Sequence, residues 1–218
     1  MSSIPVKDVP GPEHIKNFVL EEWPKYRAWR GGTPPADLRC TSWAGDKSNN
    51  SPSHSRSRAL DIVTAEWPDR RYLVEFAVWL AVVGRSKGIN VIAYPRHPQP
   101  HLHVADYSGF TGKSDPSISV MDASGKATTF PAAEYAGHAA VIIEALKKVQ
   151  DTYEKGPETD WEPFEAMLKG ENVPDEGIMQ KILGFLKKYW WAVLIPVAVL
   201  VVFMIVRAIR NRNETVEE

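Results

Sequence analysis

Three of the six histidines in this chain of 218 residues lie within one stretch of seven residues, and two of them, His101 and His103, are separated by a single leucine. If this stretch is a β-strand, alternation places both imidazoles on one face, about 6–7 Å apart along the chain. Pro98 and Pro100 favour an extended approach to that strand and cannot donate backbone hydrogen bonds. Such a pair can bind a metal or form an ordinary polar strand face, and the spacing alone leaves both open.

A second group of polar side chains precedes this pair in the sequence. His54 lies in a stretch rich in serine and arginine, and Asp61 follows seven residues later inside the apolar segment ALDIV. A carboxylate buried in such a segment is unfavourable unless it is paired or coordinates a metal. A pair with Arg58, or a cap on a neighbouring loop, is therefore the alternative to a metal site.

Together the two groups supply two imidazoles and one carboxylate, from His54, Asp61 and His103. Catalytic zinc sites use three such ligands and leave a fourth position open for water. Zinc in such a site lowers the pKa of that water towards 7 and polarises a carbonyl group. The sequence thus predicts a zinc site suited to hydrolysis.

Strands and helices must bring these residues together. The apolar runs predict strands over 59–63 and 90–94, with 101–107 as the antiparallel partner of the second, and a hairpin over 117–130. Helices are predicted from Gly11–Pro12 onward, over 69–85, whose apolar centre should be buried, and from Pro131 to about Tyr153. Residues 31–58 are poor in apolar side chains and predict a loop.

Charge and cysteine content narrow the possible functions. The chain has 26 Lys and Arg against 27 Asp and Glu, which argues against a dedicated nucleic-acid-binding protein. The single cysteine, Cys40, excludes an intramolecular disulfide and a four-cysteine zinc site.

The C-terminal region predicts a membrane anchor. Residues 189–206 contain no charge, and a helix over 189–209 is long enough to cross a bilayer. Aromatic residues at 189–191 and lysines at 187 and 188 suit the membrane interface. We expect no signal peptide at the N-terminus, and the equal number of basic residues on either side of the span does not set its orientation.

The segments that flank the span have distinct compositions. Residues 151–177 are acidic and predict a linker after a domain over 1–150, with a short helix around Trp161–Leu168 that could instead dock onto the domain. Residues 178–188 carry apolar side chains at helical spacing and predict an amphipathic juxtamembrane segment. Residues 210–218 form a polar tail.

The stretch SHSRSRALDI, residues 53–62, resembles the His-x6-Asp motif of the zinc D-Ala-D-Ala carboxypeptidases and L-alanyl-D-glutamate endopeptidases. Arg58, Ala59 and Asp61 match that motif, whereas Ser57 stands where the family usually has glycine. CTSWAGDKSNN, residues 40–50, is similar to the loop before the motif, and HLHV resembles the closing strand, whose last histidine binds zinc. Asp106 follows one residue later than the family's usual aspartate. The resemblance covers about residues 38–107.

The resemblance implies an α+β fold of the type shared with hedgehog signalling domains, in which helices flank a small antiparallel sheet. It also implies that His54, Asp61 and His103 are the zinc ligands. Relatives often use an acidic general base upstream of the last histidine, but no acidic residue lies between Glu75 and Asp106.

We therefore expect His101 or His97 to act as the base, with His101 favoured because strand alternation directs it towards His103. Arg58 could bind a carboxylate or carbonyl of the substrate, or form a structural ion pair with Asp61. The implied function is a zinc metallopeptidase, of carboxypeptidase or endopeptidase type, that hydrolyses peptide bonds of bacterial peptidoglycan.

A C-terminal anchor without wall-binding repeats suits a bacteriophage protein that lyses the wall during entry or release. Its peptidase domain would be held at the host inner membrane or the virion membrane. The alternative is a membrane-anchored module that binds zinc without catalysis, or a structural protein of the virion.

Overall fold

The computed structural model describes residues 3–31, 34–42, 58–65, 70–95, 100–107, 115–153 and 158–171. These residues all lie in the first of the two units into which the chain divides, Met1–Val173. The predicted amphipathic segment, membrane span and polar tail, as well as His54 and His97, lie outside the described residues. Within the described ranges, no helix is both long and apolar enough to span a bilayer.

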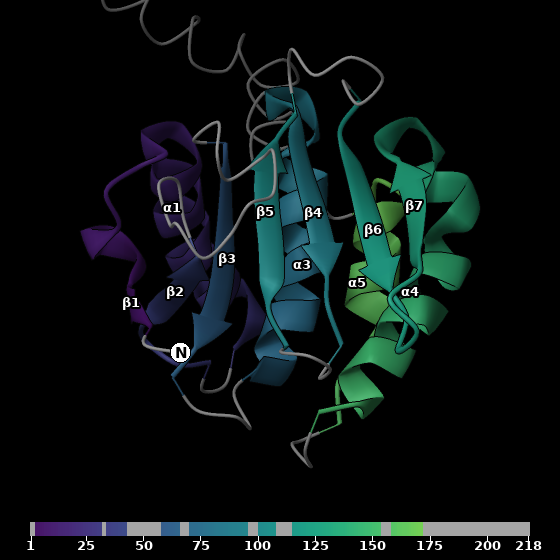
Figure 1. The fold of residues 1–218 in the computed structure, drawn as a ribbon. Helices are drawn as coiled ribbons and strands as arrows, with labels where there is room; N and C mark the ends of the chain where they lie inside the picture. The colour runs from purple at the N-terminus through teal and green to yellow at the C-terminus, as the bar shows by residue number, and fades with distance from the viewer. Residues whose placement is uncertain are drawn as a thin grey trace, which may run out of the picture. The chain divides into compact units, whose positions relative to one another are not determined.

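A seven-stranded sheet forms the centre of the described part (Figure 1). The strands lie in the order β1-β2-β3-β5-β4-β6-β7; β4 and β6 are parallel and every other neighbouring pair is antiparallel. Their bounds are Ile4–Pro5, Leu38–Ser42, Ala59–Thr64, Ile89–Ala93, Leu102–Asp106, Ser117–Met121 and Ala127–Pro131 for β1 to β7. The predicted α+β class is confirmed. The sheet, predicted to be small and antiparallel, has seven strands and is mostly antiparallel, with one parallel pair.

Helices pack against one face of this sheet, behind the strands in Figure 1. They are α1 (Glu13–Arg30), α3 (Arg71–Val83), α4 (Tyr135–Asp151) and α5 (Glu162–Leu168), with 3-10 turns at Val6–Asp8, Arg85–Lys87 and Ala132–Glu134. Ten consecutive residues of α3, from Leu73 to Val82, are buried. The all-round apolar character of this segment thus matches its central position, as the sequence predicted.

Alternation along β3 and β5 separates the core from the predicted site. Leu60 and Ile62 on β3, like Leu102 and Val104 on β5, belong to the helix-side core. Residues at odd positions between them therefore point to the opposite face, which we call the open face because the labelled helices of Figure 1 lie on the other side, although its residues on β3 are buried. Asp61 and His103 lie on that open face.

The prediction of a loop over 31–58 is wrong for Leu38–Ser42, which forms β2 and pairs with β3. Only two of its five residues are strongly apolar, so its periodicity was too weak to detect in the sequence. Pairing with the fully buried β3 stabilises this strand, and tertiary context of this kind overrides intrinsic β propensity.

The acidic region after residue 150 contains a helix that belongs to the first unit. Within or next to α5, Trp161, Phe164, Met167 and Leu168 are all buried in the common core. Glu162 is exposed, so the acidic residues lie on the outer side of the helix. The folded unit therefore extends beyond residue 150. The short helix packs onto the domain, which is the alternative to a free linker that the sequence left open.

Candidate metal centre

Asp61 and His103 are direct neighbours across the antiparallel pair β3–β5. The register places Asp61 opposite His103, and the Asp61 Oδ1 and His103 Nδ1 atoms are 2.8 Å apart. Both side chains are largely buried, with 11% and 7% of their surface exposed. Two residues 42 positions apart in the sequence thus form a close polar pair through strand register alone.

His101 lies next to this pair, just before β5 begins. Its Nε2 atom is 3.8 Å from Asp61 Oδ1, and 18% of its side-chain surface is exposed. The imidazole stacks on the ring of Tyr94, with centroids 4.1 Å apart and an interplanar angle of 17°. A backbone hydrogen bond from Tyr94 N to His101 O, 3.1 Å long, fixes the two residues opposite each other.

Two tyrosines that the sequence analysis did not identify therefore belong to this cluster. The hydroxyl of Tyr107, just after β5, lies 3.2 Å from His103 Nε2. Burial raises the pKa of Tyr94, and the negative charge of Asp61 raises it further. Alternation over 103, 105 and 107, together with the predicted pairing of 90–94 with 101–107, could have located both tyrosines.

A β-bulge brings a hydroxyl to the same face. The register between β2 and β3 shifts between Cys40 and Ser42, so that Cys40 pairs with Ile62 while Ser42 pairs with Asp61. Bulges often redirect a side chain beside a functional site. Ser42, which is buried, thus lies across from Asp61.

Arg58 lies with Asp106 rather than with Asp61. The Arg58 guanidinium is 3.6 Å from Asp106 Oδ2, and the Asp106 backbone N–H donates to Arg58 O. His14 of α1 also approaches Asp106, at 3.3 Å, so this group lies towards the helices. The ion pair predicted between Arg58 and Asp61 is thus replaced by one between Arg58 and Asp106, and the role of Arg58 in substrate binding stays a prediction.

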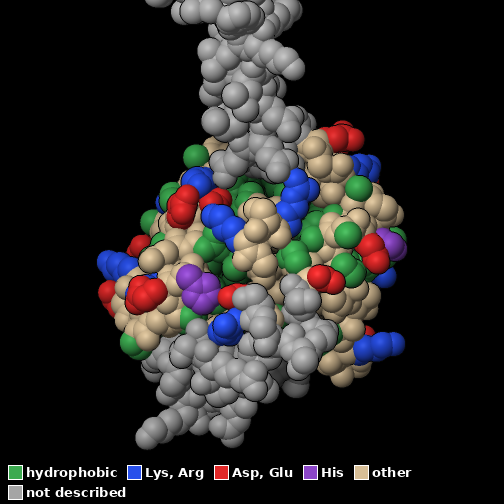
Figure 2. Space-filling model, turned by 90° about the horizontal axis from the view of Figure 1, so that it is seen from above, with side chains coloured by type: hydrophobic (Ala, Val, Ile, Leu, Met, Phe, Trp, Pro, Cys, Tyr) green, Lys and Arg blue, Asp and Glu red, His purple; other side chains and the backbone are tan. Residues whose placement is uncertain are grey.

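The upper end of the molecule carries both signs of charge. Figure 2 shows acidic and basic side chains interspersed over this end, with a histidine beside them. The described surface in this view has no large region of one sign, in agreement with the near-zero net charge.

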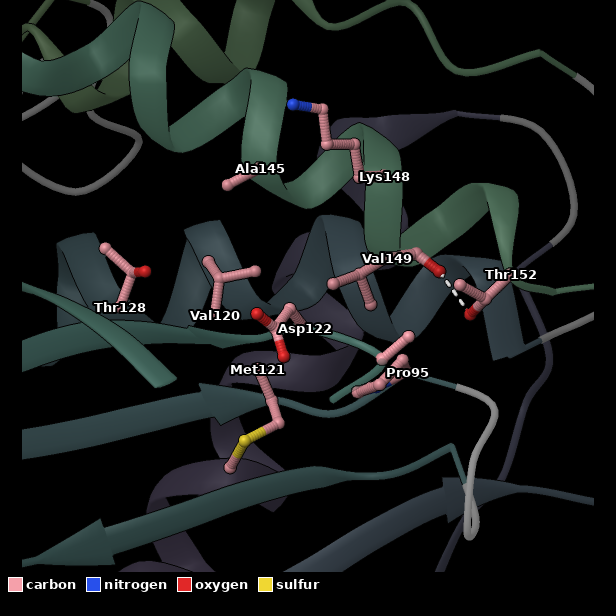
Figure 3. Close-up of a pocket in the computed structure, with 10 residues that line it drawn as sticks. Pro95, Val120, Met121, Asp122, Thr128, Ala145, Lys148, Val149 and Thr152 are labelled. Atoms are coloured by element: carbon pink, nitrogen blue, oxygen red, sulfur yellow. Dashed lines mark hydrogen bonds between the residues drawn. The ribbon is translucent and has the colours of Figure 1, made fainter. Parts of the chain in front are cut away.

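A separate cavity of about 210 Å³ lies between α4, the β6–β7 hairpin and Pro95 (Figure 3). Its lining is mainly apolar, and its charged side chains are Asp122 and Lys148. Hydrogen bonds from the Ser124 side chain and from the backbone of the turn hold the pKa of Asp122 below its usual value. Neither histidine nor cysteine occurs among the described residues that line this cavity.

Asp61 and the two imidazoles carry donor atoms of the types that zinc binds. Two donors bound to one tetrahedral zinc at about 2.05 Å would be about 3.3 Å apart. The distances from Asp61 Oδ1 to His103 Nδ1 (2.8 Å) and to His101 Nε2 (3.8 Å) fall on either side of this value. Movements of about half an ångström would bring either imidazole into place with Asp61.

The structure brings together Asp61, His101 and His103 of the predicted site residues, whereas His54 and His97 lie outside the described part. Across the described ranges, no set of three or more His, Cys, Asp or Glu side chains is arranged to hold a metal. The predicted third ligand, His54, is not among the residues on which that finding rests.

No protein-family model, curated protein or solved structure matches this chain. The resemblance to zinc peptidases consequently rests on the sequence motifs alone.

Proposed function

We propose that this chain is a zinc-dependent peptidase that hydrolyses peptide bonds of bacterial peptidoglycan. The observation that carries the proposal is the Asp61–His103 pair on the open face, with His101 beside it. These are three of the residues that the motif resemblance selects, and they come from two separate segments of the sequence. Asp61 and His103 would hold the metal together with His54.

Residue chemistry favours a metal site over a purely structural pair. A buried carboxylate paired with a histidine contributes little net stability, because desolvation offsets much of the attraction. Neutral imidazole and carboxylate are at the same time a standard ligand set for zinc. When bound, zinc would act as a Lewis acid towards a carbonyl group and lower the pKa of water.

His101 is the preferred candidate for the general base. Stacking on Tyr94 fixes the plane of its ring, and its Nε2 atom faces the position of Asp61. From there it would accept a proton from the attacking water and return it to the leaving amine. His97 remains the alternative base.

The alternative function is a zinc-binding module without catalysis. One observation favours it: among the described residues, Asp61 is the only carboxylate within 4 Å of the side-chain nitrogens of His101 or His103. The acidic base common in relatives therefore has no counterpart in the described part of the cluster. The two functions share the metal and differ in turnover.

The proposal includes attachment to a bilayer through residues 189–209. The uncharged run and its aromatic and basic flank support a single transmembrane helix. The full-length protein should remain in the membrane pellet after alkaline carbonate extraction. Release into the supernatant would overturn the anchor without bearing on the metal site.

The central experiment measures zinc and hydrolysis on the full-length protein purified in detergent. We expect one zinc per chain and release of new amino or carboxyl termini from purified peptidoglycan. His103→Ala should lose most of the metal and all turnover, whereas His138→Ala, on the exposed side of α4, should match the parent in both. Zinc without turnover would favour the non-catalytic module, and a metal-free parent would overturn both functions.

A further inference from the structure

Both ring nitrogens of His103 have a polar partner. Nδ1 lies 2.8 Å from Asp61 Oδ1, and Nε2 lies 3.2 Å from the hydroxyl of Tyr107. The tyrosine ring is inclined by 27° to the imidazole, with the centroids 6.4 Å apart. The imidazole is thus held at both edges.

These partners determine where the proton of a neutral imidazole lies. An ionised carboxylate only accepts, so its contact with Nδ1 requires the proton to be on Nδ1. Nε2 then carries a lone pair and must accept from the hydroxyl of Tyr107. The metal-free arrangement is therefore Nδ1–H donating to Asp61 and Tyr107 O–H donating to Nε2.

A metal held by Nδ1 would reverse this arrangement. A metal needs the lone pair of Nδ1, so the proton must then lie on Nε2. A tyrosine hydroxyl can both donate and accept, so Tyr107 can turn its hydrogen away and accept from Nε2–H. One proton leaves Nδ1 and one arrives at Nε2, which leaves His103 neutral in both states.

We propose that Tyr107 is a positioning residue that supports both tautomers of His103 and so holds its ring ready for the metal. This inference rests on the proposed zinc function. An acceptor-only group in place of Tyr107 would favour the proton on Nε2 at all times. Two lone pairs, on Nδ1 and on Asp61, would then face each other at 2.8 Å in the metal-free protein.

The zinc test compares two tyrosine-to-phenylalanine variants of the full-length protein. Tyr107→Phe keeps the ring and removes the hydroxyl, so zinc affinity measured by chelator competition should fall about 10–100-fold, the usual effect of losing such an outer partner. Tyr135→Phe is the matched control, because the buried Tyr135 hydroxyl has no hydrogen-bond partner among the described atoms. It should bind zinc as the parent does. Equal zinc affinity in all three proteins would overturn the inference.

The tautomer test uses ¹⁵N NMR of the His103 ring without and with zinc. We expect the proton on Nδ1 in the metal-free parent and on Nε2 after zinc is added, with the metal-free Nε2 resonance shifted in Tyr107→Phe. A metal-free parent with the proton on Nε2, or an Nε2 resonance unchanged in the variant, would overturn the inference. If the parent binds no zinc, the zinc function fails, while the metal-free spectra still decide whether Tyr107 donates to His103.

Discussion

Two buried carboxylates lie on opposite sides of the sheet, and their surroundings differ in kind. Glu75 of α3, on the helix side, is 1% exposed. Its Oε2 accepts from the Tyr26 hydroxyl and from Arg30 Nε, each at 2.7 Å, and its Oε1 accepts from the Thr159 hydroxyl at 2.7 Å. Asp61, on the open face, has imidazoles as its close neighbours.

The identity of the partners distinguishes a structural carboxylate from a candidate ligand. Tyr26, Arg30 and Thr159 donate to Glu75 and keep the same proton over the physiological pH range. Burial raises the pKa of Tyr26 and the charge of Glu75 raises it further, while the hydrogen bond to Glu75 raises the pKa of Arg30. Imidazoles, by contrast, exchange protons and bind metals near neutral pH. Burial of a carboxylate alone therefore does not identify a site.

The largest loss of stability should come from removing α5 and the residues before it, which include Thr159, a hydrogen-bond donor to Glu75. A fragment ending at residue 150 lacks Thr159 and the four buried side chains of the α5 region. Burial of four large apolar side chains contributes roughly 6–12 kcal/mol, comparable to the total stability of a domain. By circular dichroism, residues 1–150 should be unfolded and residues 1–173 folded. A cooperative unfolding transition in the shorter fragment would show that α5 is dispensable.

The next largest loss of stability is expected for Glu75→Ala. The substitution leaves Arg30 without its buried partner and should lower the free energy of unfolding by about 3–5 kcal/mol. Glu144→Ala, an exposed position on α4, is the control and should change it by less than about 0.5 kcal/mol. Zinc content of the folded Glu75→Ala protein should equal that of the parent. Loss of zinc in this variant would mean that the two carboxylates are not independent.

The sequence was sufficient to locate the strands and helices whose apolar residues recur regularly, and the site residues that lie near a recognisable motif. The strands over 59–63, 90–94, 101–107 and the hairpin were located because apolar alternation is local information. Alternation also predicted that His101 and His103 share one face of a strand. The contact between His103 and Asp61, however, depends on the register between β3 and β5, which no local pattern encodes.

The features that escaped prediction depend on contacts distant in sequence. β2 is stabilised by β3, and a bulge in β2 places Ser42 opposite Asp61. Glu75 accepts hydrogen bonds from donors 45, 49 and 84 residues away. Arg58 was paired with Asp61 as an alternative because they are close in sequence. Strand alternation instead directs the two side chains to opposite faces, and Arg58 forms an ion pair with Asp106.

A smaller loss of stability is expected for Asp61→Ala. The Nδ1–H of His103 would lose its acceptor, which costs about 1–3 kcal/mol. Asp61→Ala and Glu75→Ala should differ more in how much zinc stabilises them than in their stability without zinc. Free zinc at 100 times its Kd should add about 2.7 kcal/mol to the unfolding free energy of the parent and nothing to that of Asp61→Ala. Urea unfolding with zinc and with chelator measures both quantities, and equal zinc stabilisation of the two proteins would remove Asp61 as a ligand.

The smallest loss of stability is expected from removing the hydrogen bond between Tyr153 and the backbone of Tyr94. The hydroxyl of Tyr153, after α4, donates to the backbone carbonyl of Tyr94, whose ring stacks on His101. Tyr153→Phe removes one hydrogen bond and should lower the unfolding free energy at pH 7 by about 0.5–1.5 kcal/mol. Tyr94 keeps its backbone bond to His101, so zinc content should not change.

The pH dependence of this variant tests whether Tyr153 is buried and neutral. Burial raises the pKa of Tyr153 in the folded protein above its ordinary value of 10.0. The folded state therefore holds this proton more tightly than the unfolded state, and the associated stability is complete below pH 10 and is lost as the pH rises through the folded pKa. Phenylalanine has no proton to lose, so the gap in stability between parent and Tyr153→Phe should narrow above pH 10. Urea unfolding at pH 7, 10 and 11 measures the gap, and a constant gap would show that Tyr153 is accessible to ionise without unfolding.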